Sequence, residues 1–370
     1  TAVASTLATS MAFDATGGTL TVTEVDSAGA NVATAYTMTG TSVVTVGGTL
    51  STATTTVTST NTGGVSVSLT GASQAITASF GSGADTVTAL SADDIITTGA
   101  GNDTVTTTAV LTTGSVNAGD GTDILIITDA THVANSALGL KYSNFETLTV
   151  NGATQDVSLI SGITSINLGA ATSKSITGLS AAQAAAITVT AGNSTASTFA
   201  LTTATGTSDV LTLNLTSATA TLNVGMAGLV VTGFETVNFN ATTGVADTQS
   251  AITFGTAAEL TALNITGSAD TSLATANITA VAAISASAST GAFTVSGALA
   301  SGSTVTGSAT AINTMTLSTT LGTTYTGGTA ADAYIAVIAS IVTTGSNDNV
   351  IAGGGGTDNL TLSDAAMTLT

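Results

Sequence analysis

The sequence predicts an all-β protein made of parallel β-roll or β-solenoid segments, with additional β-rich rungs or sandwich-like strands and few short helices. Thr and Val alternate along much of the chain, which is typical of strands. Gly, Asn or Ser interrupt this alternation at intervals of about ten residues. Aromatic residues make up only 3% of the sequence, and Pro and Trp are absent, so a thick globular core is not expected.

Short alternating segments place apolar residues on one face of the chain at many positions. Their spacing is too loose for a strict repeat, so the sequence alone leaves solenoid rungs and sandwich strands unseparated. The predicted strands are residues 20–22, 65–69, 148–150, 166–168, 187–189, 211–215, 222–224, 237–239, 263–265, 293–295 and 315–317.

Helical signals are few. Residues 180–186 and 256–263 are each predicted to form a turn or two of helix, with Ser180 and Thr256 as N-caps. Residues 330–342 fit a helix or a strand equally well. None of these segments carries residues with recognisable chemistry.

The charge of the chain excludes several classes of partner. The sequence has 21 acidic residues and two basic ones, Lys141 and Lys174, giving a formal net charge of −19. Such a chain attracts small cations, but it cannot neutralise a nucleic-acid backbone or an anionic lipid surface. No apolar run approaches the roughly 18 residues that a transmembrane helix needs. We therefore expect neither a nucleic-acid partner nor a transmembrane segment.

A nonapeptide repeat lies between residues 80 and 106. The first copy begins at Gly81 and the third at Gly99, whereas the middle copy keeps its Asp but lacks both glycines. The aspartates of these copies, Asp85, Asp94 and Asp103, are nine residues apart. A further copy follows at residues 119–125 and another at 353–360, after a weaker version at 345–351.

This repeat has the composition of a calcium-binding coil. In the pattern G-G-x-G-x-D-x-U-x, glycines permit turns that direct carbonyl oxygens inward, Asp adds a carboxylate, and the apolar residue U starts a strand. Calcium takes six to eight oxygen ligands, so we expect two turns, stacked nine residues apart, to share an ion. Oxygen ligands without His or Cys favour calcium over transition metals. One such copy among 41 glycines would indicate only a turn, but several copies in phase predict structural calcium.

Residues for catalysis are not recognisable in this sequence. His132 is the only histidine, and we expect it at the surface or in a loop. No G-x-S-x-G elbow and no P-loop is present. The pair Asp93 and Asp94 lies inside the repeat, which favours a ligand or a charged face over acid–base chemistry. We predict that the chain is not an enzyme.

A second pattern, Phe-Glu-Thr before an alternating segment, recurs at residues 144–150 and 233–239. Each copy follows a segment that starts with an aspartate, Asp123 or Asp209. We interpret the pattern as a structural unit in which the Phe anchors the next strand. For the glutamates, Glu146 and Glu235, three roles stay open: a calcium ligand, a cap of a backbone turn or a solvated charge.

The nonapeptides resemble those of the repeats-in-toxin (RTX) family. Their surroundings, rich in Thr, Ala, Gly and Val and free of Cys, resemble S-layer proteins of Gram-negative bacteria of the Caulobacter type. Position 94 departs from the RTX pattern, so its site is expected to be incomplete or to depend on Asp93. By this resemblance, calcium binding is carried by Gly81, Gly83, Asp85, Asp94, Gly99, Gly101, Asp103, Gly119, Gly121, Asp123, Gly354, Gly356 and Asp358.

The resemblance implies a secreted structural protein of the cell wall, exported by type I secretion, that folds with calcium and self-assembles as a two-dimensional S-layer lattice on the cell surface. An RTX-type adhesin or biofilm-matrix protein is the alternative. The implied partners are neighbouring copies of the chain, calcium, and lipopolysaccharide or another surface anchor. The anchor would be reached through a part outside this sequence, which we expect to be a piece of a longer protein.

The pattern of repeats predicts a division of the chain into segments. We expect a β-rich segment at 1–79, the RTX calcium-binding β-roll at 80–130, a solenoid-like lattice region at 131–340 and a second, truncated RTX segment at 341–370.

Overall fold

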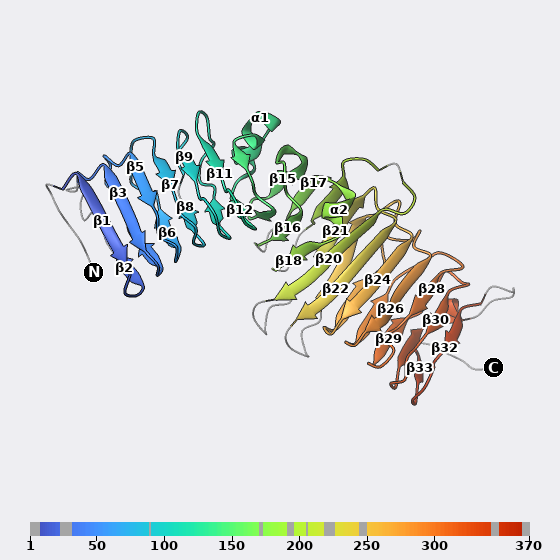
Figure 1. Ribbon diagram of the computed structural model, residues 1–370. Coiled ribbons are helices and arrows are strands. Elements are labelled where there is room, and N and C mark those ends of the chain that lie inside the picture. The colour runs from blue at the N-terminus through green and yellow to red at the C-terminus, as the bar shows by residue number, and fades with distance from the viewer. Residues whose placement is uncertain are drawn as a thin grey trace, which may run out of the picture. The chain divides into compact units, whose positions relative to one another are not determined.

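The computed structural model describes residues 8–22, 32–88, 90–169, 173–190, 196–204, 206–217, 226–243, 250–341 and 348–364. The chain divides into two compact units, Thr1–Ile166 and Asn167–Thr370. Each unit is a parallel β-solenoid of short strands (Figure 1). The predicted all-β solenoid fold is therefore confirmed, and sandwich strands are not needed to describe it. None of the helices in the described ranges has the length and apolarity to cross a membrane.

Successive strands of the first unit alternate between two parallel sheets, so that each turn of the coil adds one strand to both. One sheet contains β1 (Ser10–Ala15), β3 (Ala35–Gly40), β5 (Thr56–Ser59), β7 (Thr77–Ser79), β9 (Ile95–Thr97), β11 (Ser115–Asn117) and β13 (Tyr142–Ser143). The other contains β2 (Leu20–Val22), β4 (Val44–Val46), β6 (Val65–Ser68), β8 (Thr86–Thr88), β10 (Thr104–Thr106), β12 (Ile124–Ile127) and β14 (Thr147–Val150).

The end of the first unit adds irregular elements to the coil. They are two 3-10 helices, η1 (Ala130–Val133) and η2 (Val157–Leu159), one short helix, α1 (Ser136–Gly139), and strand β15 (Thr154–Asp156). Strand β16 (Ser165–Leu168) spans the boundary between the units.

The second unit follows the same alternation. One sheet contains β18 (Ile187–Val189), β20 (Val210–Ser217), β22 (Thr236–Thr243), β24 (Ala262–Gly267), β26 (Ala283–Ser289), β28 (Thr304–Thr306), β30 (Thr324–Thr326) and β32 (Val350–Ala352). The other contains β17 (Ser175–Leu179), β19 (Thr198–Leu201), β21 (Met226–Thr232), β23 (Ser250–Thr256), β25 (Thr271–Ala274), β27 (Phe293–Ser296), β29 (Asn313–Thr316), β31 (Ala333–Ala336) and β33 (Asn359–Leu362). Helix α2 (Ala181–Ala184) and 3-10 helix η3 (Ile338–Ser340) complete it.

The core of the coil is a set of stacked side-chain columns. Alternate residues of a strand point inward, and in-register pairing of the strands places Val87, Val105, Leu125 and Leu148 in one column. All four side chains are completely buried. Burial of a Val or Leu contributes about 1.5–3 kcal/mol, so a thin core of small residues is stabilised by repetition and needs few aromatic residues.

Turns of different length explain why the sequence shows no strict repeat. Hydrogen bonds between equivalent positions of neighbouring turns join residues 18 apart at Asp85 and Asp103, 23 apart at Asp123 and Glu146, and 26 apart where Asp209 meets the next turn. The strands keep their register, and the added residues lie in the connections between them.

Most of the short elements predicted from the sequence are present, with one exception. The helix at 180–186 is confirmed as α2, and Ser180 caps it in a capping box with Gln183. The helix predicted at 256–263 is wrong: the chain leaves β23 at Thr256 and enters β24 at Ala262. Residues 330–342 contain both β31 and η3. The strand predicted at 222–224 lies outside the described residues, and the other predicted strands coincide with or overlap observed ones.

Candidate functional site

The aspartates of the repeats point into the coil. Asp85 lies one residue before β8, and strand alternation places it on the same side as the buried Val87. Asp103 and Asp123 stand in the same relation to β10 and β12. Their side chains are 1%, 0% and 0% exposed, respectively. A carboxylate group is thus buried at three consecutive turns of one sheet, and we call Asp85, Asp103 and Asp123 the acidic column.

The copies that stack on each other are not the ones expected from the sequence. Asp94 lies one residue before β9, which belongs to the opposite sheet, whereas Thr86 of β8 pairs with Thr104 of β10. One nonapeptide is therefore half a turn of this coil. The expectation that copies nine residues apart stack and share an ion is wrong, because such copies lie on different sheets and copies one full turn apart are the neighbours.

A ladder of hydrogen bonds links the acidic column to the backbone. Oδ1 of Asp85 accepts from the N–H of Val65 at 2.6 Å, Oδ1 of Asp103 from that of Asp85 at 2.8 Å, and Oδ1 of Asp123 from that of Asp103 at 2.7 Å. Oε2 of Glu146 continues the ladder and accepts from the N–H of Asp123 at 2.8 Å. Each acid thereby accepts a backbone N–H at the start of a strand, or one residue before it, in the preceding turn.

The second oxygen of each aspartate in the column has no such partner. The Oδ2 atoms of Asp85, Asp103 and Asp123 are buried and accept no hydrogen bond from the described residues. Burial raises the pKa of Asp85 from 3.8 to about 7, helped by the charge of Asp103. Burial also raises the pKa of Asp123, with contributions from the charges of Asp103, Glu146 and Asp120. Burial thus disfavours the ionised forms of Asp85 and Asp123, and a bound cation would offset this cost.

The glycines of the repeats line up beside this column. Gly81, Gly99 and Gly119 stack in consecutive turns, so closely that a Cβ at Gly99 would lie 2.1 Å from the carbonyl oxygen of Gly81. A Cβ at Gly119 would lie 1.8 Å from that of Gly99. Gly83, Gly101 and Gly121 form a parallel stack, with Gly101 at a φ of +133° and a Cβ-to-carbonyl distance of 2.4 Å to Gly83. Only glycine fits these turns.

These residues fit a calcium ion in part. Calcium needs six to eight oxygens, and the free Oδ2 atoms are suitable ligands. The carbonyls of Gly81 and Gly99 accept hydrogen bonds from Ala100 and Asp120 at 2.9 Å, which leaves a second lone pair on each oxygen. Across the described part of the chain, no three His, Cys, Asp or Glu residues gather around one point. Backbone carbonyls and water would thus have to supply most of the ligands.

Asp94 is placed differently from the acidic column. Its Oδ1 accepts from the N–H of Ile76 at 2.9 Å and from the hydroxyl of Ser91 at 2.7 Å, and its Oδ2 accepts from the N–H of Ser91 at 2.6 Å. Both oxygens are therefore used by the protein. The neighbouring Asp93 is exposed and accepts from the hydroxyls of Thr112 and Thr113, which lower its pKa. Neither carboxylate offers a free buried oxygen.

The C-terminal copy repeats the ladder in the second unit. Oδ1 of Asp358 accepts from the N–H of Asp332 at 3.0 Å, and Oδ1 of Asp332 accepts from that of Asn313 at 2.8 Å. Gly354 and Gly356, both with positive φ, lie on the carbonyls of the preceding turn. Of the weaker copy, Gly345 and Asn347 lie outside the described residues. In that copy, Asn349 uses Oδ1 to accept from the N–H of Thr323 at 2.9 Å.

The ladder includes residues that the repeat pattern did not identify. Glu146 and Glu235 each accept the backbone N–H of the aspartate one turn earlier, Asp123 and Asp209, at 2.8 Å. Of the three roles left open by the sequence, the backbone cap is the one observed. Asp332 also belongs to the ladder, and it follows Gly327-Gly328 in a partial copy of the pattern in which Ala330 replaces the third glycine. The sequence signal for all of them is an acid or Asn immediately before an alternating strand.

His132 is buried, which corrects the expectation of a surface or loop residue. It lies in η1 at 7% exposure, and its Nδ1 is 2.8 Å from the hydroxyl of Thr107. Burial lowers the pKa of its imidazole. The ring therefore connects two turns of the coil.

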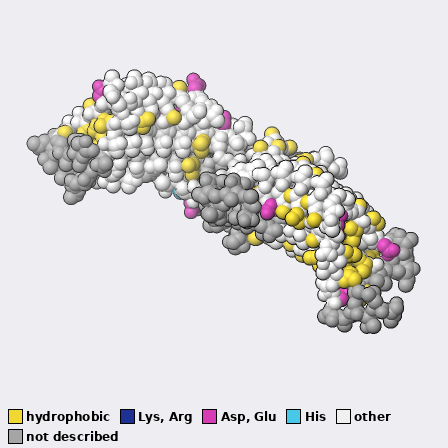
Figure 2. All heavy atoms as spheres, turned by 90° about the horizontal axis from the view of Figure 1, so that it is seen from below, with side chains coloured by type: hydrophobic (Ala, Val, Ile, Leu, Met, Phe, Trp, Pro, Cys, Tyr) yellow, Lys and Arg dark blue, Asp and Glu magenta, His cyan; other side chains and the backbone are white. Residues whose placement is uncertain are grey.

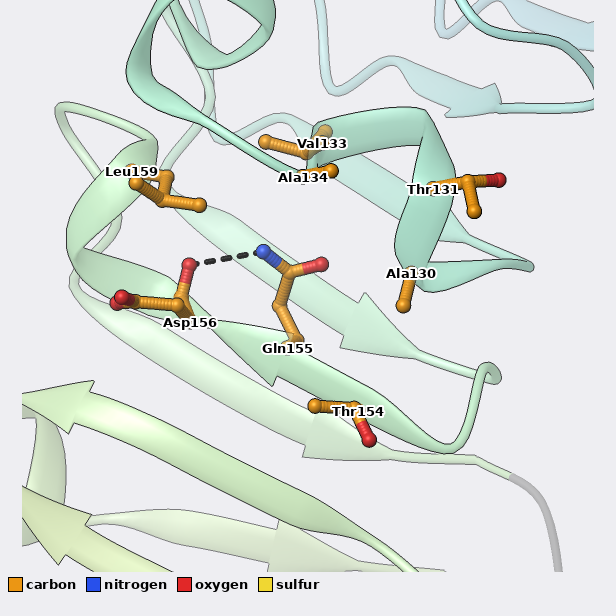
Figure 3. A pocket seen from close by; sticks show the side chains of 8 residues that line it. All are labelled: Ala130, Thr131, Val133, Ala134, Thr154, Gln155, Asp156 and Leu159. Carbon is orange, nitrogen blue, oxygen red and sulfur yellow. Dashed lines mark hydrogen bonds between the residues drawn. The ribbon is translucent and has the colours of Figure 1, made fainter.

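A pocket of about 270 Å³ lies between η1 and η2 (Figure 3). Methyl and methylene groups of Ala130, Val133, Ala134 and Leu159 line most of it. Figure 3 shows Gln155 between the two helices: its amide nitrogen donates to the carbonyl of Asp156 at 2.8 Å, and its oxygen is directed toward η1. That oxygen is buried without a hydrogen-bond partner among the described residues.

Comparison with known proteins adds no relative. No model of a protein family matches the chain, and no curated protein is similar to it.

Proposed function

We propose that this chain is a calcium-stabilised β-solenoid of the RTX type that is secreted and forms part of a bacterial S-layer. The observation that carries this proposal is the acidic column of Asp85, Asp103 and Asp123 at stacked glycine turns. Three of its buried oxygens accept no hydrogen bond from the part of the chain that the structure describes. The proposed role is structural and not catalytic.

Calcium is the neutralising partner that suits this column best. An unpaired buried carboxylate costs several kcal/mol, and proteins avoid it by protonation or by a bound cation. Oxygen donors select calcium or magnesium, and the flexible coordination of calcium tolerates carbonyls from two turns better than the strict octahedron of magnesium does. Extracellular calcium sites bind at about 10⁻⁴ to 10⁻³ M. Sites of that affinity would stay empty at cytoplasmic calcium levels and fill outside the cell.

Export and folding would then be coupled. Without calcium, repulsion within the acidic column weakens the coil and favours an unfolded chain, which suits type I secretion. Outside the cell, each site held at a hundredfold excess over its dissociation constant would add roughly 2.7 kcal/mol to the folded state. A thin solenoid core would gain substantially from a few such sites.

The surface of the chain suits repeated contacts between copies. Figure 2 shows a face made mostly of backbone and uncharged polar atoms, with groups of apolar side chains and few acids. Such a face presents little charge repulsion to a neighbouring copy despite the net charge of −19. This supports a lattice of identical subunits over an adhesin that recognises another molecule.

Calcium-dependent assembly tests the proposed function. Purified chain is treated with a chelator and returned to calcium or to magnesium, and assembly is followed by light scattering and electron microscopy. The proposal predicts ordered two-dimensional arrays in calcium and none in magnesium or with Asp103→Asn. Folding without arrays would favour the adhesin, and arrays in chelator would contradict a calcium-dependent lattice.

A further inference from the structure

The loop between β12 and β14 carries an unusually exposed apolar side chain. Leu140 follows α1 and is 80% exposed, more than any other large apolar side chain among the described residues. In Figure 1, α1 lies at the outer edge of the first unit. Gly139 fixes the base of this loop, since a Cβ there would lie 1.8 Å from the carbonyl oxygen of Leu159. Leu140 therefore projects into solvent from a backbone segment that packs closely against Leu159.

Lys141, the next residue, is the one basic side chain of the sequence that is not fully buried. The sequence has two basic residues, and Lys174 is 1% exposed. Lys141 is half-buried. In a chain of net charge −19, an exposed apolar side chain, Leu140, is thus followed directly by a positive charge, Lys141.

The pocket between η1 and η2 has the complementary chemistry. It is lined mainly by Ala, Val and Leu side chains and holds about 270 Å³. Water takes about 30 Å³ per molecule in the liquid, so the four carbons of a leucine side chain fit with room to spare.

Two carboxylates lie at the helix starts beside this pocket: Asp156 lines it, and Asp129 immediately precedes the lining residue Ala130. Asp129 caps η1 and Asp156 caps η2, each accepting from a backbone N–H two residues later at 2.8 and 3.0 Å. Hydrogen bonds from Thr131 hold the pKa of the exposed Asp129 below its usual range, so it is ionised at neutral pH. An apolar pocket with acids at its rim fits an apolar group followed by a cation.

We propose that this pocket receives Leu140 and Lys141 of a second copy of the chain. Leu140 enters between η1 and η2, and Lys141 pairs with the carboxylates at the rim. Helix α1 contacts both η1 and η2, so the donor segment and the receiving pocket lie on adjoining elements. A two-fold pair therefore forms both contacts at once, each copy giving Leu140 and receiving its partner's. The pocket is lined by no residue of the acidic column, and the pairing does not require a lattice.

Sedimentation in calcium-containing buffer, at protein concentrations below those at which arrays form, measures this pairing in the full chain. Leu140→Ser should raise the dissociation constant of the pair at least about tenfold, equivalent to 1.4 kcal/mol, and Lys141→Gln should weaken it less. Ile312→Ser is the matched control, because Ile312 is 56% exposed in the second unit. Leu140 packs against little, so its loss should leave the circular dichroism spectrum unchanged. An equal effect of Ile312→Ser would overturn the proposal.

Mixing two variants distinguishes binding in the pocket from non-specific association. Ala134→Phe fills the pocket from its rim but keeps Leu140, whereas Leu140→Ser keeps an open pocket. Each variant alone forms neither contact, and a mixed pair can form one of the two. The proposal expects pairing in the mixture at concentrations where both separate variants are monomers. A mixture that stays monomeric, or a wild-type chain that never pairs, would overturn it, whatever calcium does to the fold.

Discussion

The backbone N–H of Asp85 donates a 2.8 Å hydrogen bond to Oδ1 of Asp103, its counterpart one turn later. This bond uses one oxygen of the buried carboxylate to close a strand end and leaves the other without a partner among the described residues. The same residue is thus a structural cap and a candidate cation ligand. The same kind of hydrogen bond, from a backbone N–H to a carboxylate one turn later, recurs from Val65 to Glu146. It therefore links several consecutive turns of the coil.

The stability of the calcium-free protein should fall as pH rises from about 4 to about 7. The pKa of Asp85 is raised from 3.8 to about 7 in the fold, so in this range the unfolded state releases a proton that the folded state keeps. Stability falls with pH wherever the unfolded state binds fewer protons. Urea unfolding in chelator at several pH values measures the slope.

Asp85→Asn provides the matched control for this slope. The amide keeps an oxygen for the N–H of Val65 and does not titrate, as Asn349 shows at an equivalent position. The variant should lose less stability than wild type between pH 4 and 7. His132, whose pKa is lowered, changes stability in the opposite direction in both proteins and cancels in the comparison. If stability falls no more steeply with pH in the wild type than in the variant, the raised pKa of Asp85 is contradicted.

Gly101→Ala should destabilise the first unit by at least about 2 kcal/mol, since it combines a positive φ with a collision against a backbone carbonyl. Gly17→Ala is the control, because nothing lies within 4 Å of a Cβ there, and it should change stability by about 0.5 kcal/mol or less. Thermal melting in calcium compares the two. Equal effects would show that the glycine turns are not packed as described.

Glu146→Ala should lower the free energy of unfolding by about 1.5–3 kcal/mol, the usual contribution of a hydrogen bond to a charged group. The change removes the acceptor for the N–H of Asp123. Glu146→Gln keeps an acceptor oxygen and should recover most of the loss. Hydrogen exchange of the Asp123 amide reports the bond directly: it should speed up in the Ala variant and stay slow in the Gln variant. Fast exchange in the wild type would contradict the cap.

The fold class could be predicted from the sequence because alternation and turn residues are local signals. Strand positions such as 187–189 followed directly from the Ile-Thr-Val pattern and coincide with β18. The helix predicted at 256–263 failed because Leu260 and Leu263 are both buried by the coil, so tertiary packing overrides a modest helix propensity. The choice between solenoid and sandwich depends on pairing between distant residues, which local pattern does not contain.

The candidate site was predicted in its residues but not in its geometry. Regular spacing identified Asp85, Asp94 and Asp103 together, yet a spacing of nine does not reveal whether a copy is a full turn or half a turn. Only strand pairing places Asp94 on the other sheet. The role of Glu146 could not be chosen from sequence, because a cap, a ligand and a solvated charge require the same residue.

The most direct test of the account is the unfolding of wild type and Asp103→Asn by urea in chelator, in calcium and in magnesium. Asp103 is buried between two other acids of the column. We expect calcium, but not magnesium, to stabilise the wild type by at least about 2.7 kcal/mol at a hundredfold excess over its dissociation constant. We also expect that Asp103→Asn loses most of this gain, whereas the exposed Asp14→Asn keeps it. Equal stability of the wild type in chelator and in calcium would contradict calcium binding by the acidic column.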